Sequence, residues 1–174
     1  MTIHKTVLFQ KVFETEWFSI EATSEKFPNN KPYYRLSCAD SVIMLATTGE
    51  HKIILVRQFR PALGVHTLEF PAGYVDQGES TIDAVKREFY EETGFVCTSV
   101  TPVGSYKLAP SRINNNLHFF FGEAIKTKHE KKPSRQIDVV LVTEDELKQL
   151  IIKEQLLEVA GAAIYLSAKL RGLL

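Results

Sequence analysis

The chain has 174 residues, a length that fits one domain able to bury a sizeable core. Hydrophobic residues make up 44% and charged residues 24% of it, a globular composition that excludes a long disordered chain. Because Lys+Arg and Asp+Glu both number 21, the net charge indicates neither a nucleic acid nor a membrane surface as a partner.

Cysteines and apolar runs narrow the class of protein further. Cys38 and Cys97 form no CxxC pattern, which argues against a disulfide scaffold or a thiolate zinc site. No run approaches the roughly 18 apolar residues of a membrane helix, and the N-terminal segment MTIHKTVLFQ lacks the apolar core of a signal peptide. We therefore expect a cytoplasmic protein without a membrane partner.

The first half of the chain is predicted to be mostly β-structure. Short apolar runs and period-2 alternation predict strands at residues 17–27, 33–38, 41–47 and 52–59. Residues 27–32 are predicted to form a loop, and residues 48–51, TGEH, a turn. Trp17 is expected to be partly buried in the core rather than to stack on a base.

One clear helix follows, at residues 81–93. Ser80 fits the N-cap position with Asp83 three residues on, and Gly94 fits the position after the helix. Further strands are predicted at residues 98–108, 117–125 and 137–142. Two more helices are predicted, one opened by the capping-box pair Thr143 and Glu146 and one at residues 154–170. Strands around a central helix, with helices at the end, predict an α+β fold around one core.

Three glutamates of the helix at residues 81–93 share one face. Glu88, Glu91 and Glu92 fall within an arc of roughly 100°, although like charges at this spacing destabilise a helix. A solvated acidic face is one interpretation. The other is a divalent-cation site, because clustered carboxylates are hard oxygen ligands that suit Mg²⁺ or Mn²⁺.

A resemblance to a known family favours the cation site. Residues 73–95, GYVDQGESTIDAVKREFYEETGF, match the signature of the Nudix hydrolases at every specified position. The matched positions are Gly73, Glu79, Arg87, Glu88, Phe89, Glu91, Glu92, Gly94 and Phe95. The resemblance implies a loop–helix–loop metal site in an α/β/α sandwich with a mixed central sheet. It also implies hydrolysis of nucleoside diphosphates linked to a further moiety.

The resemblance assigns roles to the residues of the motif. The metal would be bound by Glu88, Glu91, Glu92 and the carbonyl of Ala72, with Mg²⁺ as the expected cofactor and Mn²⁺ as a substitute. Arg87 belongs to the expected catalytic set with these glutamates, although an internal ion pair with Glu79 is the favoured interpretation of its role. Structural roles in the motif are expected for Gly73, Glu79 and Gly94.

Segments outside the motif resemble the ADP-ribose pyrophosphatase branch of the family. Residues 55–73 contain the QFR and EFPAG sequences of that branch, and Pro110 stands where it commonly has a proline. Substrate contacts are accordingly expected from Arg57, Arg60, Glu69 and Arg112: the first two arginines on the diphosphate, and Glu69 on a ribose or sugar hydroxyl. The general base is expected to be Glu88, with Glu130 as the alternative.

The expected reaction is Mg²⁺-dependent hydrolysis of the pyrophosphate bond of ADP-ribose or a related nucleoside diphosphate sugar, giving a nucleoside monophosphate and a sugar phosphate. One alternative keeps the chemistry but changes the substrate to a dinucleotide, a nucleoside triphosphate or a capped RNA. Another is a nucleotide-binding module without catalysis, which the intact motif disfavours. Neutral net charge disfavours long nucleic acids. Residues 1–40 are predicted to be N-terminal strands packed on a hydrolase domain at 41–174, where they shape the substrate pocket or a homodimer.

Overall fold

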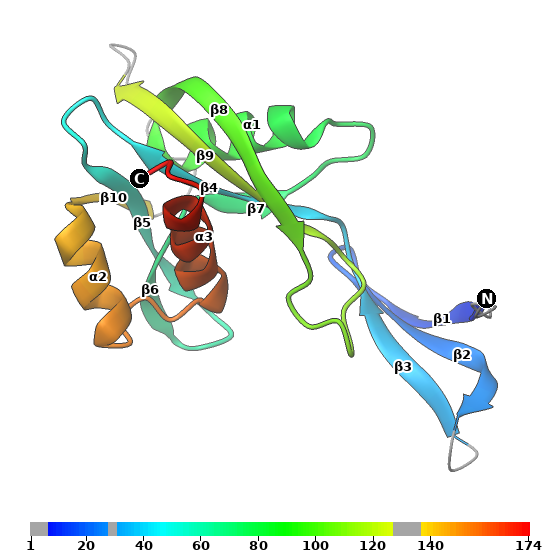
Figure 1. The fold of residues 1–174 in the computed structure, drawn as a ribbon. Helices are drawn as coiled ribbons and strands as arrows, with labels where there is room; N and C mark the ends of the chain where they lie inside the picture. The colour runs from blue at the N-terminus through cyan, green and yellow to red at the C-terminus, as the bar shows by residue number, and fades with distance from the viewer. Residues whose placement is uncertain (1–6, 28–30, 127–136) are drawn as a thin grey trace.

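The computed structural model of the chain describes residues 7–27, 31–126 and 137–174, where it contains two sheets and three helices (Figure 1). The elements in chain order are β1 (Phe9–Glu14), β2 (Ser19–Phe27), β3 (Lys31–Ser37), β4 (Ser41–Thr47), β5 (Ile53–Arg60), β6 (Val65–Glu69), β7 (Ala72–Tyr74), α1 (Thr81–Thr93), β8 (Phe95–Tyr106), β9 (Leu117–Lys126), β10 (Ile137–Val142), α2 (Glu144–Ile152) and α3 (Val159–Leu170). The predicted α+β class is confirmed.

A mixed sheet forms the centre of the molecule. Its main path is β10-β5-β4-β9-β8, with β6 paired to β5 and β7 paired to β4. Strands β4 and β9 run parallel, and the other pairs of this sheet are antiparallel. Strand β4 lies inside the sheet with helices on both faces, which explains why SVIMLAT is a continuous apolar run and not an alternating one.

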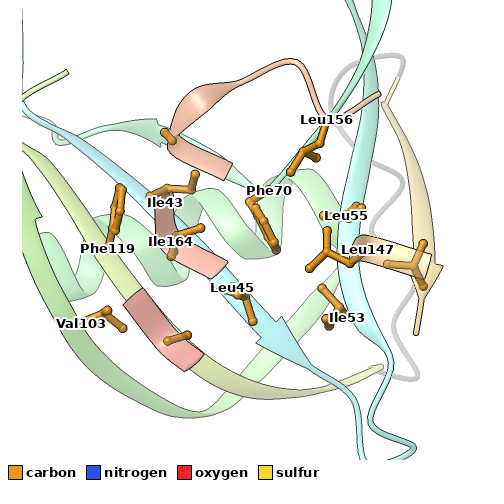
Figure 2. Close-up of a cluster of buried hydrophobic side chains, with 13 residues drawn as sticks. Ile43, Leu45, Ile53, Leu55, Phe70, Val103, Phe119, Leu147, Leu156 and Ile164 are labelled. Carbon is orange, nitrogen blue, oxygen red and sulfur yellow. The ribbon is translucent and has the colours of Figure 1, made fainter. Parts of the chain in front are cut away.

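Helices cover both faces of this sheet and complete an α/β/α sandwich. On one face, α1 buries an apolar cluster that includes Val42, Met44, Ile54, Val85 and Phe89. On the other face, α2 and α3 bury a second cluster that includes Ile43, Leu45, Phe70, Leu147 and Ile164 (Figure 2). Neighbouring residues of β4 therefore belong to different cores, as the period of two in a strand requires.

The N-terminal strands β1, β2 and β3 form a separate antiparallel sheet that projects from the central sheet (Figure 1). The two parts are joined where the backbone N–H of Leu36 donates to the carbonyl of Arg112 at 2.8 Å. This contact brings the end of β3 against the loop between β8 and β9.

Several boundaries and three short strands differ from the sequence prediction. Strand β2 begins at Ser19 and not at residue 17, and Lys31 and Pro32, which were predicted as loop, belong to β3. Helix α3 begins at Val159 and not at residue 154. The reason is a turn before it, in which the N–H groups of Gln155 and Leu156 both donate to the carbonyl of Leu150 and Glu154 has a positive φ of 56°. Strand β8 begins directly after Gly94, three residues before the predicted start. Strands β1, β6 and β7 were not predicted as separate elements.

Candidate active site

Helix α1 is fixed at both ends by the residues that the sequence suggested. The Ser80 hydroxyl accepts a hydrogen bond from the N–H of Asp83 at 3.1 Å, and Gly94 adopts a left-handed conformation with φ of 71°. The apolar side chains Val85 and Phe89 are buried against the sheet. The opposite side of the helix therefore presents its glutamates to the loop that precedes it.

Arg87 ties this helix to the preceding loop. Its Nε and Nη2 atoms donate to the two carboxylate oxygens of Glu79 at 2.9 and 2.8 Å, and Nη2 also donates to the carbonyl of Tyr74 at 3.0 Å. The hydrogen bonds that Arg87 donates to Glu79 are the main cause that raises the pKa of Arg87, and the same bonds lower the pKa of Glu79. A two-point ion pair of this kind is rigid, so Arg87 has the geometry of a structural residue.

Glu88 and Glu92 approach the short strand β7 from the helix. The Glu88 carboxylate lies against the Cα atom of Gly73, so close that a Cβ atom there would be 2.0 Å from its Cδ. Glu92 is 6% exposed and accepts a hydrogen bond from the N–H of Ala72 at 3.1 Å. Burial, reinforced by the negative charge of Glu88, raises the pKa of Glu92 to about 7.

These side chains line a cleft of about 660 Å³. Its lining consists of Trp17, Ser41, Arg60, Pro61, Ala72, Gly73, Tyr74, Glu88, Glu92, Leu108, Asn115, Leu117 and Glu158. A narrower pocket of about 230 Å³ is lined by all three glutamates of the motif together with Arg87, Trp17 and Tyr74. The cleft therefore combines carboxylates, a guanidinium group and an aromatic wall.

The donor set fits a divalent cation. It consists of hard oxygen ligands, and Glu92 is a buried carboxylate whose raised pKa a nearby cation would lower. Among the described residues, no three His, Cys, Asp or Glu side chains stand close enough together to hold an ion as they are. Arg87 lies beside two of these carboxylates, since Nη1 donates to Glu88 at 2.8 Å and lies 3.8 Å from Glu91.

A second ion pair fixes the guanidinium group of Arg60, which lines the cleft. Arg60 donates through Nε to Glu69 at 2.8 Å and through Nη2 to the other oxygen of the same carboxylate. The Thr67 hydroxyl donates to Glu69 at 2.6 Å. Burial would raise the pKa of Glu69, but the hydrogen bonds from Arg60 and Thr67 outweigh it and lower the pKa below its ordinary value.

Comparisons with known proteins agree with this geometry. The NUDIX domain family matches residues 38–160. The chain belongs to the Nudix family of pyrophosphohydrolases. An ADP-ribose pyrophosphatase of Bacillus subtilis is 30% identical over 156 residues, which cover 86% of this chain and 84% of that protein. A methanol dehydrogenase activator of Bacillus methanolicus is 25% identical over 157 residues, which cover 87% of this chain and 85% of that protein.

The Nudix fold is also found in a solved structure, a crystal structure of an ADP compounds hydrolase. It superposes with a TM-score of 0.77 at 20% sequence identity and covers 97% of this chain and 95% of that one. Within the described part of the Nudix chain, no helix combines the length and apolarity that crossing a membrane would need.

The structure separates the residues that were expected to bind substrate. Arg60 lines the Nudix cleft, but Arg57 does not, because residues three apart in the regular strand β5 project to opposite faces of the sheet. Arg112 lies over the ring of Tyr33 at 4.4 Å and lines a separate pocket of about 370 Å³. The wall of this cleft thus includes Arg60 but neither Arg57 nor Arg112, and substrate contact by these two stays a prediction.

Two further expectations concern carboxylates. Glu69 was expected to hold a sugar hydroxyl, but it is 6% exposed and both its oxygens are engaged by Arg60. It is instead the residue that positions Arg60. Glu130, the alternative general base, lies outside the described residues.

Several cleft residues were not predicted from the sequence. Trp17 was expected to be partly buried, yet it is 60% exposed at the wall of the Nudix cleft. Ser41, Asn115 and Glu158 line the cleft from three different elements or loops. None of them belongs to a local motif, so only the paired strands and the packing of α3 bring them together.

Proposed function

We propose that this Nudix enzyme uses Mg²⁺ to hydrolyse the pyrophosphate bond of ADP-ribose or a related nucleoside diphosphate sugar, giving a nucleoside monophosphate and a sugar phosphate. The observation that carries the proposal is that Arg60, Glu88 and Glu92 line one cleft. A fixed guanidinium group suits a diphosphate, and the adjacent carboxylates suit the cation that accompanies it.

Each residue has a distinct task in the proposed reaction. Arg60, held by Glu69, presents its remaining donors to the diphosphate without having to be ordered on binding. Glu92, Glu88, Glu91 and the carbonyl of Ala72 would hold Mg²⁺, which neutralises diphosphate charge and activates water. Glu88 would accept the proton of the attacking water, and Arg87 with Glu79 would keep the helix in place beneath it.

The choice of substrate is supported by sequence and by the shape of the cleft. The relative that is 30% identical over most of the chain is an ADP-ribose pyrophosphatase, and an ADP-sugar pyrophosphatase of Mus musculus is 36% identical over 105 residues, which cover 53% of this chain and 48% of that protein. The exposed ring of Trp17 offers a flat surface on which a base can stack. Dinucleotides, nucleoside triphosphates and capped RNA are the competing substrates.

A hydrolysis panel tests the proposal. Purified protein is given ADP-ribose, ADP-glucose, a dinucleotide, ATP and a capped RNA oligonucleotide, each with Mg²⁺ and with chelator, and the products are separated by chromatography. We expect AMP and ribose 5-phosphate from ADP-ribose, no turnover in chelator, and recovery with Mg²⁺ or Mn²⁺. Glu92→Gln should lower kcat by at least about 10²-fold, whereas Glu50→Gln, an exposed turn carboxylate, should not. A strong preference for ATP over every diphosphate sugar would contradict the proposed substrate class. Full activity in the presence of chelator would contradict the proposed need for a metal ion.

A further inference from the structure

Glu158 stands at the N-cap of α3 but does not cap the helix. Its backbone is extended, with φ of −79° and ψ of 120°, and its side chain makes no hydrogen bond to the first turn. Ser, Thr, Asp and Asn are the side chains that usually fill this role. The Glu158 carboxyl is therefore available for another purpose, and it lines the cleft together with Arg60 and Glu92.

One oxygen of this carboxyl has no hydrogen-bond partner among the described residues. Oε2 of Glu158 is one of two side-chain polar atoms in the described residues that are fully buried without a hydrogen bond. Arg60 directs its Nε and Nη2 atoms to Glu69, and its remaining Nη1 group makes no hydrogen bond to Oε2 of Glu158. Burial, followed by the negative charge of Glu69, raises the pKa of Glu158 to about 7, and the positive charge of Arg60 opposes this shift.

A buried acceptor without a donor is costly, and such groups are often satisfied by a ligand. The terminal torsion of a glutamate side chain is broad and two-fold, so a modest rotation can turn either oxygen toward the cleft. A hydroxyl group supplies the missing donor. A phosphate oxygen does not supply a donor to the ionised carboxylate, because it is itself an acceptor and carries like charge.

The position of Glu158 indicates which part of a substrate it meets. Trp17 and Tyr74 line both the cleft and the adjoining pocket of about 230 Å³, whereas Glu158 lines only the cleft. That pocket also contains the three glutamates of the motif, so a metal-bound diphosphate would reach from there to Arg60, with the base against the aromatic rings. The end with Arg60 and Glu158 suits the diphosphate and the sugar beyond it.

We propose that Glu158 is a specificity-determining residue that accepts a hydrogen bond from a hydroxyl of the sugar attached to the diphosphate. This inference rests on the proposed function and extends it. A site that hydrogen-bonds a substrate hydroxyl discriminates against analogues that lack it, because the buried acceptor is then left unpaired. Glu158 would thus favour sugar-linked diphosphates over substrates that end in bare phosphates or alkyl groups.

Two substrates and three variants test the role of Glu158. ADP-ribose is compared with the β-methyl ester of ADP, which keeps the pyrophosphate diester but has no second sugar. We expect Glu158→Ala to lower kcat/KM for ADP-ribose by about 10- to 100-fold and to leave kcat/KM for the methyl ester within about threefold of wild type. Glu158→Gln keeps an amide oxygen that can accept the hydroxyl, so it should retain most of the preference. Glu154→Gln, an exposed carboxylate of the same segment, is the control and should not change either value.

The outcomes separate the inference from the proposed function. Suppose that wild type cleaves ADP-ribose. If Glu158→Ala then loses activity equally on both substrates, or loses none, Glu158 does not recognise the sugar. If Glu158→Gln is as impaired as Glu158→Ala, the role of hydroxyl acceptor is wrong. If wild type cleaves no diphosphate sugar, the proposed function itself fails. Should Glu158→Ala unfold in a thermal melt, Glu158→Met, which has similar volume and no strong acceptor, replaces it.

Discussion

The carboxylate of Glu88 lies where the side chain of any residue other than glycine at position 73 would begin. A Cβ atom on Gly73 would be 2.0 Å from Cδ of Glu88 and 2.3 and 2.4 Å from its two oxygens. The glycine thus permits the helix carboxylate to reach the backbone of β7 at the wall of the cleft. Gly73 is not required here for a left-handed backbone conformation, since its φ lies outside that region.

Gly73→Ala should therefore displace Glu88 and lower kcat by about 10²-fold, the effect expected when a reacting group moves by about 1 Å. Far-ultraviolet circular dichroism should remain unchanged, because the clash is with a side chain and not with backbone. Gly49→Ala is the matched control, since a Cβ atom at Gly49 meets nothing within 4 Å. Equal activity of the two variants in steady-state kinetics would contradict the catalytic importance of this contact.

The two arginines of the QFR segment should behave differently. Arg60→Ala removes a positively charged side chain from the cleft, so we expect a raised KM for ADP-ribose. It also leaves Glu69 buried without its main partner, so we expect a lower melting temperature. Arg57→Ala removes an exposed side chain from the opposite face of β5 and should change KM by less than about threefold. Kinetics and thermal melts of both variants check this assignment. If Arg57→Ala raised KM more than Arg60→Ala does, Arg57 would be assigned to the substrate site.

The contact between α2 and α3 should make stability depend on pH. Glu144 accepts hydrogen bonds from Lys169 and Tyr165, and these lower its pKa from 4.5 to about 2. A lowered pKa in the folded state stabilises the protein above the unfolded value, and this contribution is lost as pH falls through the folded value. Glu144→Gln should therefore be less stable than wild type at pH 7, and the difference should shrink between pH 4.5 and about pH 2. Urea unfolding at several pH values measures it, with Asp145→Asn as an exposed control. A difference that does not vary with pH would contradict the prediction.

The separate N-terminal sheet should form a homodimer interface. Val12, Phe13 and Tyr34 are each more than half exposed in it, and apolar patches of this kind mark association surfaces. Light scattering should give twice the 19.7 kDa of one chain. Phe13→Asp with Val12→Asp should give the mass of one chain, whereas Leu170→Asp, an exposed apolar residue of α3, should not. A wild-type mass of one chain at micromolar concentration would exclude a stable dimer.

Local signals account for what the sequence predicted well. Helix α1 has the predicted bounds, because Ser80 and Gly94 fix its ends through contacts within a few residues. The predicted start of α3 was too early, because the apolar run at residues 154–170 includes a turn. Hydrogen bonds to the carbonyl of Leu150 form this turn, and the sequence pattern does not encode them. Strand β7 has three residues and exists only through its pairing with β4.

The same distinction holds for the cleft. The glutamates of the motif and Arg60 were identified from local sequence, and the structure places Arg60, Glu88 and Glu92 together. The period of two in β5 could have separated Arg57 from Arg60 beforehand. The place of Trp17 and Glu158 in the cleft could not have been predicted, because they reach it from the segment between β1 and β2 and from the N-cap of α3, whose packing no local pattern encodes.

Glu88 and Glu130 are the two candidates for the general base, and the effects of their substitution on kcat should differ. Glu88 lines the cleft beside Glu92, and Arg87 orients it by a hydrogen bond of 2.8 Å to Oε1. A carboxylate that is held in place next to a bound cation can accept a proton from the attacking water. We therefore expect Glu88→Gln to lower kcat by about 10²- to 10⁴-fold, the range for loss of a general base. Glu130→Gln should change kcat little.

The control for this contrast is a measurement of metal binding, because Glu88 is also an expected ligand of the cation. If Glu88→Gln still gains thermal stability from Mg²⁺ as wild type does, its loss of kcat reports proton transfer and not loss of the metal. A severe Glu130→Gln and a mild Glu88→Gln would assign the base to the segment between β9 and β10 instead.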